Sequence, residues 1–418
     1  MKPTTEIFDN LPQLPIRERD RRWAKVRAWM AEEMIDCLLV VGNDISFGLG
    51  MANYRYLSSI GTRHGGFLIF PQNGEPVAFC EPFHMTLPIH PNAIAQNWVS
   101  DVRHNGGGIG AVIEVIKERV SPLKRLALIS GANVLQRENI PYTIYQAVID
   151  GFPDAVVFNG SSFIANMRKI KSEDELDFLR NAGKIHNKVV QAMISATNEG
   201  VTEADVYAEM VGTMIKHGGE AVIFNLLHSG PTEGSAQQHL LHGLTQNIGP
   251  TQRVLKRGDT VISESHVTFG GYMTAAEYTV CIGPVNDMYK KIFDVAIECQ
   301  QAAMEKLKPG TVIADVARAE KAVLKKYNMG WLELGIHSHG LSSPEEPECV
   351  YMGMDPKTWY VTKEMEEVVL CENMVFGMNI DIHDPAFRKD VGVMFGDTVI
   401  IKDKPELLVM VPEELVIK

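Results

Sequence analysis

The 418-residue sequence lacks the features that mark membrane-spanning, secreted and nucleic-acid-binding proteins. No uninterrupted apolar run approaches the roughly eighteen residues that a membrane-spanning helix requires, and the first residues lack the apolar core of a secretory signal. The 40 basic and 52 acidic side chains give a net charge of 40 − 52 = -12, without a tail of one sign. We therefore expect a cytoplasmic protein that binds neither membranes nor nucleic acids.

Cysteine is scarce and shows no pattern of a metal or redox site. The sequence has 6 cysteines, none of them in a CxxC pair, and most have apolar neighbours. This usage is typical of free buried thiols rather than of disulfides, zinc ligands or redox centres. A chain of 418 residues is long enough for two domains, or for one large α/β domain with an appendage.

The first part of the chain, residues 1–160, alternates between helical and strand patterns. Residues 17–34 repeat with a helical period, and the apolar run at 35–41 has the length of a buried strand. Further along, Asn73 and Gly74 join two apolar runs as the turn of a hairpin would. These patterns predict an α/β domain in which helices cover a sheet.

A second domain, residues 161–418, begins with a different pattern. Ser172 followed by Glu175 is a capping box that opens a long helix. The later patterns indicate an α+β domain with helices packed on a curved antiparallel sheet. Helices are predicted at 203–217, 287–307 and 312–327, strands at 259–267, 271–282, 374–383 and 391–401, and a polar loop at 229–249.

The segment GDTVISESHVTFGGYMTAAEYTV, from Gly258 to Val280, resembles the strand pair of the pita-bread fold. Methionine and proline aminopeptidases, prolidase, creatinase, ectoine hydrolase and an iron-dependent dimethylsulfoniopropionate lyase share this fold. The landmarks RKIKSEDEL, LLHSGP, LKPG, HSHG, ENMVFGMNIDI and GDTVIIKD follow in the family's order. The resemblance covers essentially the whole chain. It implies a creatinase-type α/β domain at 1–160 and a pita-bread catalytic domain of the creatinase/aminopeptidase fold at 161–418.

Most members of that family hold two divalent metals with two Asp, one His and two Glu ligands. By position, these ligands fall on Glu264, Ala275, His337, Asn379 and Gly396. Three of the five side chains cannot bind a metal through charge. The resemblance therefore implies that the ordinary metal pair is absent, and we expect a metal-independent enzyme without a cofactor.

The site pattern resembles those of creatinase and ectoine hydrolase. Glu277 matches a creatinase glutamate that contacts the guanidinium group, HSHG begins at His337 with the same pair as creatinase, and Glu264 matches a glutamate of ectoine hydrolase. In creatinase an arginine from the neighbouring subunit binds the substrate's carboxylate, and the matching residue is Arg63, followed by His64. The resemblance thus implies a homodimer whose site is shared between subunits.

We expect from this resemblance a creatinase-like hydrolase that cleaves a non-peptide C–N bond (amidine, guanidino or amide) of a small zwitterionic metabolite. A loop histidine would act as general base and acid, and an insertion leaves the choice between the two loop histidines open. The candidate residues are His239, His242, Glu277 and His337 for catalysis, and Arg63, His64, Glu264, Asp381 and Asp397 for substrate binding.

Two other classes of function remain open. Strand alternation places Glu264 and His266 on one face, and Asp381 and His383 on one face of a later strand. With His337 and His339 nearby, these side chains could form a rebuilt zinc or iron site. The chain would then be an Xaa-Pro dipeptidase or a dimethylsulfoniopropionate-type lyase. The third class is a non-catalytic binding module, in which the histidines are structural.

Overall fold

A computed structural model describes most of the chain and divides it into two compact units. Unit 1 consists of Met1–Arg168 and Leu341–Glu346, and unit 2 of Lys169–Gly340 and Pro347–Lys418. The border lies after Arg168 because the helix that ends there belongs to unit 1, whereas the sequence predicts a border at 160. The described residues are 11–43, 49–61, 65–80, 96–104, 108–130, 139–220, 225–233, 250–353, 357, 361–388 and 390–418.

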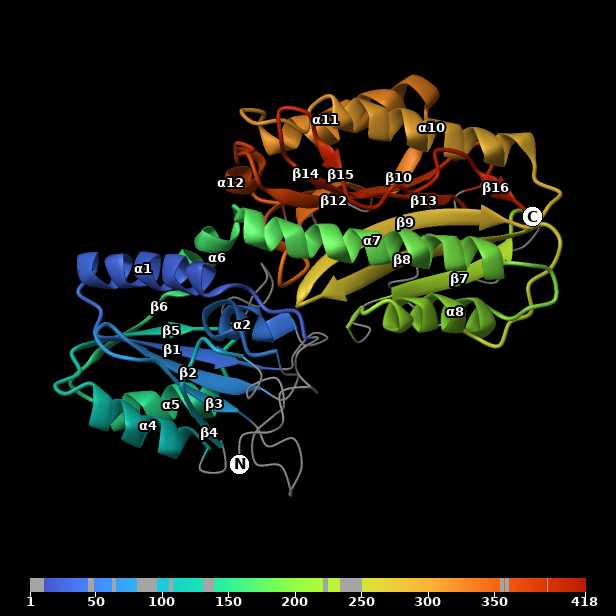
Figure 1. The fold of residues 1–418 in the computed structure, drawn as a ribbon. Helices are drawn as coiled ribbons and strands as arrows, with labels where there is room; N and C mark the ends of the chain where they lie inside the picture. Colours follow the sequence, from blue (N-terminus) through green and yellow to red (C-terminus); the bar gives the residue numbers. More distant parts are fainter. Residues whose placement is uncertain are drawn as a thin grey trace. The chain divides into compact units, whose positions relative to one another are not determined.

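Unit 1 is built on a 6-stranded mixed sheet with the order β4-β3-β2-β1-β5-β6, and helices lie on both of its faces (Figure 1). Strand β1 runs parallel to β5 and antiparallel to β2, and β2 and β3 form the expected hairpin around Gly74. The α/β prediction is confirmed. The strands are β1 Cys37–Gly42, β2 Gly66–Pro71, β3 Val77–Cys80, β4 Asp101–His104, β5 Arg125–Ile129 and β6 Val156–Asn159, and the helices are α1 Ile16–Glu32, η2 Leu49–Met51, α2 Ala52–Ser58, α4 Gly108–Arg119, α5 Tyr142–Gly151 and α6 Ser161–Arg168.

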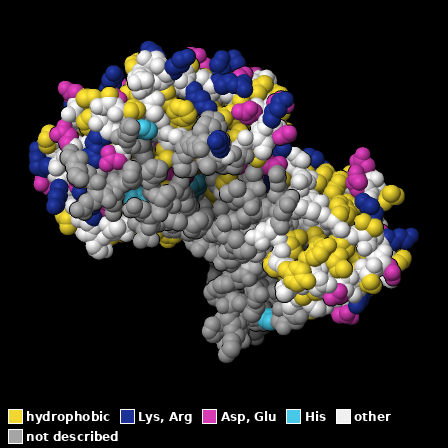
Figure 2. All heavy atoms as spheres, turned by 180° about the vertical axis from the view of Figure 1, so that it is seen from behind, with side chains coloured by type: hydrophobic (Ala, Val, Ile, Leu, Met, Phe, Trp, Pro, Cys, Tyr) yellow, Lys and Arg dark blue, Asp and Glu magenta, His cyan; other side chains and the backbone are white. Residues whose placement is uncertain are grey.

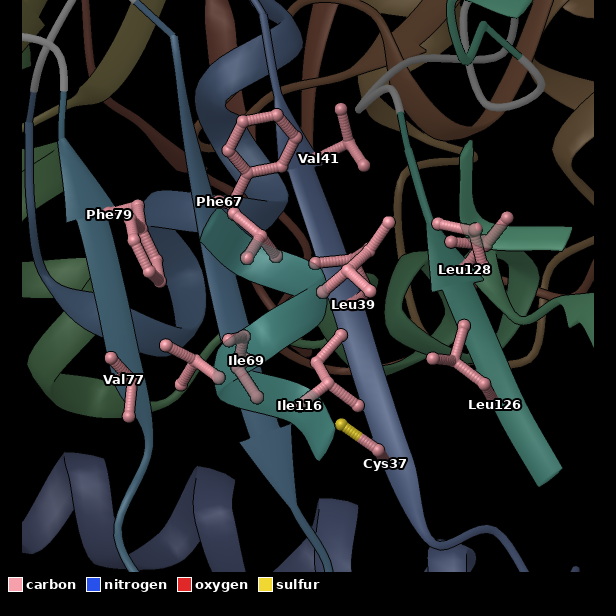
Figure 3. Close-up of a cluster of buried hydrophobic side chains, with 14 of the residues drawn as sticks. Cys37, Leu39, Val41, Phe67, Ile69, Val77, Phe79, Ile116, Leu126 and Leu128 are labelled. Carbon is pink, nitrogen blue, oxygen red and sulfur yellow. The ribbon is translucent and has the colours of Figure 1, made fainter. Parts of the chain in front are cut away.

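The core of unit 1 follows from strand alternation. Cys37, Leu39 and Val41 of β1 are fully or almost fully buried and belong to one cluster with Ile69 of β2 and Ile116 of α4. Figure 3 shows these side chains together between the sheet and the helix. Because alternate residues of a strand point to the same face, the continuous apolar run of β1 fills both faces of the sheet.

A buried ion pair joins the segment Leu341–Glu346 to the rest of unit 1. Arg168 at the end of α6 forms an ion pair with Glu345, and both side chains are 3% exposed. The same guanidinium donates to Oδ1 of Asn53 at 2.8 Å. Such a pair holds its partners firmly, because either charge alone would be costly to bury.

Unit 2 contains two sheets, β11-β10-β12-β14-β15 and β16-β9-β8-β7, and β13 pairs with β12. Helices α10 and α11 lie along the first sheet, and α7 and α8 lie beside the second (Figure 1). The α+β prediction is confirmed. The helices are α7 Glu173–Ala196, α8 Glu203–Lys216, α10 Asp287–Met304, α11 Ile313–Tyr327 and α12 Lys363–Glu366, and the strands are β7 Asn225–Pro231, β8 Asp259–Phe269, β9 Tyr272–Cys281, β10 Gly330–Ser338, β11 Glu345–Met352, β12 Val375–His383, β13 Val393–Phe395, β14 Thr398–Ile400, β15 Glu406–Leu407 and β16 Val416–Ile417.

Local sequence explains the start of α7 and the turn between β8 and β9. At α7 the Ser172 hydroxyl accepts from the amide of Glu175 at 3.2 Å, and the Glu175 carboxylate accepts from the amide of Ser172 at 2.9 Å. Between β8 and β9, Gly270 and Gly271 have φ angles of 58° and 87°. A two-residue hairpin turn with two positive φ angles favours glycine at both positions.

Two predicted elements differ from the structure. The residues 225–231 form β7, which pairs with β8, so the first three residues of the predicted polar loop at 229–249 belong to a strand. Residues 234–249 lie outside the described residues. The predicted strand at 391–401 is divided into β13 and β14, because Gly396 forms a bridge with Glu277 of the other sheet. This bridge brings the two sheets together beside Glu277.

No helix of the described residues is both long and apolar enough to cross a membrane. All 6 cysteines of the sequence are free thiols. Lys and Arg are interspersed with Asp and Glu on the described part of the surface that Figure 2 shows.

Candidate functional site

The candidate site lies within unit 2, between faces of its two sheets. On β8, Ser265 contacts His186 of α7, so Glu264 and His266 point to the opposite face, away from that helix. On β12, Phe376 and Met378 belong to the core beneath α11, so Asn379 points to the opposite face. The polar faces of the two sheets meet where Asn379 contacts β9.

Asn379 links the two sheets through its side-chain amide. Its Nδ2 donates to Oε1 of Glu277 on β9 at 3.0 Å and to Oε2 of Glu333 on β10 at 3.3 Å. Glu264 lies directly opposite Glu277 in the β8–β9 pair. Asp381, two residues after Asn379, contacts Glu277 through its carboxyl group. The structure therefore gathers four carboxyl groups, which we name the acidic cluster: Glu264, Glu277, Glu333 and Asp381.

A β-bulge positions Glu333. The pairing register of β10 and β12 shifts between Trp331 and Leu334. A bulge inserts an extra residue and re-aims the neighbouring side chains. Glu333 and His337 are half-buried, whereas Glu277 and Asp381 are each 2% exposed. The acidic cluster therefore reaches solvent on the side formed by β10.

The acidic cluster has no basic partner among the described residues. None of its four carboxyl groups forms an ion pair with lysine or arginine there, and Glu264 has only a 3.9 Å contact to Nε2 of His266. Burial and, second, the charge of Glu333 raise the pKa of Glu264 to about 8, and burial raises the pKa of Glu333 to about 7. Burial and the neighbouring carboxylates also raise the pKa values of Glu277 and Asp381. The cluster thus retains protons near neutral pH.

Three imidazoles lie beside the acidic cluster. The ring centroid of His339 is 4.7 Å from that of His337 and 5.8 Å from that of His266. Burial lowers the pKa of His337 to about 4 and also lowers the pKa of His339. Among the described residues, no hydrogen-bond partner contacts either ring nitrogen of His339. His337 and His339 are therefore neutral near pH 7 and able to accept a proton.

Gly377 creates the space for His339. A Cβ at Gly377 would lie 2.3 Å from Nε2 of His339 and 3.4 Å from Cε1 of His337. Any side chain at this position of β12 would displace the buried ring. A glycine within a strand is typical of such a close approach.

The predicted site residues are only partly gathered by the described structure. Glu264, Glu277, His337 and Asp381 meet around Asn379. Asp397 instead accepts from the backbone amides of Thr398 at 2.7 Å and Val409 at 3.0 Å, so it fixes the chain after β13. Arg63, His64, His239 and His242 lie outside the described residues, and their roles and the shared homodimer site stay predictions.

Sequence reasoning missed Glu333 and His186. Alternation on β10 could have revealed Glu333, because it has the same parity as Gly335 and His337. The bulge at this point of the strand has no sequence signal that we recognised. His186 is fully buried in α7 and contacts the hydroxyls of Ser265 at 2.8 Å and Thr274 at 2.9 Å. It supports the β8–β9 pair from behind the site.

Comparisons with known proteins identify the family. Residues 177–403 match metallopeptidase family M24, and residues 22–170 match the creatinase/prolidase N-terminal domain. This chain therefore belongs to metallopeptidase family M24. The pita-bread fold that the sequence predicts is confirmed.

Similar proteins are named Xaa-Pro dipeptidases. The chain is 26% identical to one from Pyrococcus furiosus over 57% of this chain and 62% of that protein, so the match spans less than two thirds of that relative. It is 24% identical to one from Lactobacillus delbrueckii subsp. lactis over 89% of this chain and 94% of that protein. The solved prolidase of Pyrococcus horikoshii has a TM-score of 0.72 at 21% identity, covering 95% of this chain and 100% of that one, which shows the shared fold.

These comparisons overturn two expectations. The relatives are dipeptidases, which cleave peptide bonds, so the creatinase-like cleavage of a non-peptide C–N bond is wrong. The expectation of a metal-independent enzyme is contradicted as well, because the matching family is one of metallopeptidases. The creatinase likeness was carried by a few short segments that line the site, whereas the dipeptidase likeness extends along the chain.

The described side chains nevertheless do not fit the five-ligand metal pair that the family resemblance implies. Ala275 and Gly396 offer no donor atom in their side chains. A Cβ at Gly396 would lie 2.1 Å from the backbone oxygen of Met378 and 2.9 Å from Oε2 of Glu277, so the Glu277 carboxylate takes the space of a ligand there. Within the described ranges, no group of three or more His, Cys, Asp or Glu side chains is placed to hold a metal ion.

Proposed function

We propose that this chain is a peptidase that hydrolyses the peptide bond of a short peptide, with Xaa-Pro dipeptides as the substrate class. The names of its relatives support this class. The observation that carries the proposal is the acidic cluster. Three of its four carboxyl groups are buried, it has no basic partner among the described residues, and it lies beside neutral imidazoles. Carboxyl groups that hold protons because they are buried and repel one another can ionise when a cation binds between them, and a dipeptide supplies a cation at its free amino end.

His337 and Glu333 are suited to the two proton transfers of peptide hydrolysis. They lie on the same face of β10, both are half-buried, and both contact Asn379. In the proposed reaction, neutral His337 accepts a proton from water as the water oxygen bonds to the carbonyl carbon. The C–N bond then breaks, and protonated Glu333 gives its proton to the leaving nitrogen. Asn379 acts as a positioning residue for both groups.

This assignment predicts a bell-shaped dependence of kcat/KM on pH. His337 must be neutral, so activity rises above its pKa of about 4, and Glu333 must be protonated, so activity falls as the pH passes about 7. Glu333→Gln keeps the size of the side chain but cannot donate a proton as an acid. We expect it to lower kcat/KM about 100-fold and to remove the limb near pH 7.

The test measures the release of free proline from Ala-Pro and Leu-Pro, with Ala-Ala as a comparison. The full chain is assayed as purified and with added Mn²⁺ or Co²⁺, because its family consists of metallopeptidases. Glu209→Gln on the exposed side of α8 is the matched control and should keep wild-type activity. Absence of proline release under every condition, from protein shown to be folded, would refute the proposed function.

We also infer a cytoplasmic location for this protein. Its 6 cysteines are free, and free thiols are typical of a reducing compartment. Fractionation of cells that produce the protein would test this inference.

A further inference from the structure

Three Asn-Gly pairs occur in the sequence, and the structure places two of them in very different surroundings. Asparagine is a thermolabile residue, because the backbone nitrogen of the following residue can attack its side-chain carbonyl carbon. A following glycine has no Cβ to hinder this approach. The pairs are Asn73-Gly74, Asn105-Gly106 and Asn159-Gly160, and the second of them lies outside the described residues.

Asn73 and Gly74 are exposed in the loop between β2 and β3. Gly74 has a φ of 99°, and a Cβ built on it would meet no atom within 4 Å. In the part of the chain that the structure describes, the amide nitrogen of Gly74 and the side chain of Asn73 form no hydrogen bond. The attacking nitrogen and the carbonyl group that it attacks are therefore both accessible and unrestrained.

Asn159 and Gly160, at the end of β6, are held by hydrogen bonds at the same atoms. The amide nitrogen of Gly160 donates to the backbone oxygen of Leu128 at 2.9 Å. Oδ1 of Asn159 accepts from the amide of Ser161 at 2.9 Å. Gly160 is also buried, and a Cβ there would lie 2.9 Å from Cδ1 of Ile129. Attack by this nitrogen would break a hydrogen bond in a packed environment, a cost that is absent from the exposed loop.

A cation lies beside the exposed pair. Nη2 of Arg27 on α1 donates to the backbone oxygen of Gly74 at 2.6 Å. Nε of the same guanidinium is buried and has no acceptor within the described ranges. A nearby positive charge favours a negative one. This applies both to the glycine nitrogen when it loses its proton and to a carboxylate formed at position 73.

We propose that Asn73 is a site of spontaneous deamidation and that the fold protects Asn159 from the same reaction. The nitrogen of Gly74 loses its proton and bonds to Cγ of Asn73. The Cγ–Nδ2 bond breaks, and Nδ2 leaves as ammonia with that proton, so that a cyclic succinimide remains. Water then adds to either carbonyl carbon of the ring and gives aspartate or isoaspartate at position 73. The reaction needs no oxidant or reductant, and it does not depend on the proposed function.

The first experiment ages the folded, full-length protein at pH 8.5 and measures the modification of each asparagine by peptide mapping with mass spectrometry. We expect Asn73 to be deamidated at least tenfold faster than Asn159. The same chain unfolded in guanidinium chloride is the matched control. There the two rates should agree within about threefold, because only the local sequence remains. Equal rates in the folded protein would overturn the proposal, as would a difference of the same size in the unfolded chain.

The second experiment tests the succinimide through its products. Opening of the ring gives both aspartate and isoaspartate, whereas direct hydrolysis of the side chain by water gives aspartate alone. We expect isoaspartate in the peptide that contains position 73, detected by methyl transfer from S-adenosylmethionine with an isoaspartyl methyltransferase. Aspartate without isoaspartate in that peptide would overturn the proposal.

The third experiment tests the attacking nitrogen. Because this nitrogen must lose its proton, the rate at Asn73 should rise at least fivefold between pH 6.5 and pH 8.5. Asn73→Gln keeps the amide in the exposed loop but requires a larger ring, so the modification at position 73 should slow at least tenfold. A rate that does not depend on pH, or a glutamine modified as fast as the asparagine, would show that Gly74 is not the nucleophile and would overturn the proposal.

Discussion

The substitution Glu264→Gln should make unit 2 more stable at alkaline pH and leave it nearly unchanged at acidic pH. Glu264 is buried opposite Glu277, and burial, followed by the charge of Glu333, raises its pKa from 4.5 to about 8. When folding raises the pKa of an acid, the unfolded chain ionises first, as the pH passes about 4.5, and this ionisation stabilises the unfolded chain relative to the folded one. The folded chain holds its proton until about pH 8. Stability is therefore lost across that window as the pH rises.

The magnitude follows from the width of the window. A shift from 4.5 to about 8 is 3.5 units, and about 1.36 kcal/mol per unit gives roughly 5 kcal/mol as an upper limit. Glutamine does not ionise, so this loss is absent from the variant. Because the neighbouring carboxyl groups titrate together with Glu264, the loss of stability is shared by the whole acidic cluster and does not belong to Glu264 alone. We expect a net gain of about 2–5 kcal/mol at pH 8.5 and less than about 1 kcal/mol at pH 4.5.

Urea unfolding at both pH values measures this difference, with hydrogen exchange of β8 and β9 to assign the transition to unit 2. Glu209→Gln on exposed α8 provides the control and should show no pH-dependent difference. If Glu264→Gln changes the free energy of unfolding equally at pH 4.5 and pH 8.5, the carboxyl group is not held protonated by its neighbours. The account of the acidic cluster would then be wrong.

Two other substitutions test the packing of each unit. Gly377→Ala should lower kcat/KM at least tenfold, because its Cβ would lie 2.3 Å from Nε2 of His339; in the control Gly212→Ala, where a Cβ meets no atom within 4 Å, activity should be unchanged. Equal activity of the two variants would show that catalysis does not depend on the position of the His339 ring. Arg168→Met should destabilise unit 1 by about 3–5 kcal/mol in urea unfolding, since Glu345 would be left buried without its partner. A loss below about 1 kcal/mol would mean that the segment Leu341–Glu346 is held by other contacts.

Most secondary structure could be read from the sequence because its signals are local. The capping box at Ser172 and the helical periods of α8 and α11 depend only on neighbouring residues, and the structure confirms them. The division of the last predicted strand could not be read in this way. It depends on the bridge between Gly396 and Glu277, which are 119 residues apart (396 − 277) in the chain.

The candidate site was predictable in its parts but not in its chemistry. Alternation along β8 and β12 predicted the faces on which Glu264 and Asp381 lie, and the structure brings both side chains into the acidic cluster; their role in a site stays a prediction. The short creatinase-like segments were then given too much weight, since a few residues around a cavity do not identify the reaction of a fold that supports many. Glu333 was missed because no strand was predicted at the position of β10, and a β-bulge in that strand sets the direction of its side chain.

The sequence by itself determined the family, the order of helices and strands, and the loss of donor side chains at Ala275 and Gly396. These properties depend on residue identity and on local periodicity, and both are visible in a single chain. Only the tertiary structure decided that Glu264, Glu277, Glu333 and Asp381 share one buried cluster and that Asn379 connects its two sheets. Their pKa values are raised because burial and mutual repulsion disfavour ionisation, and both effects arise only when distant strands are packed together.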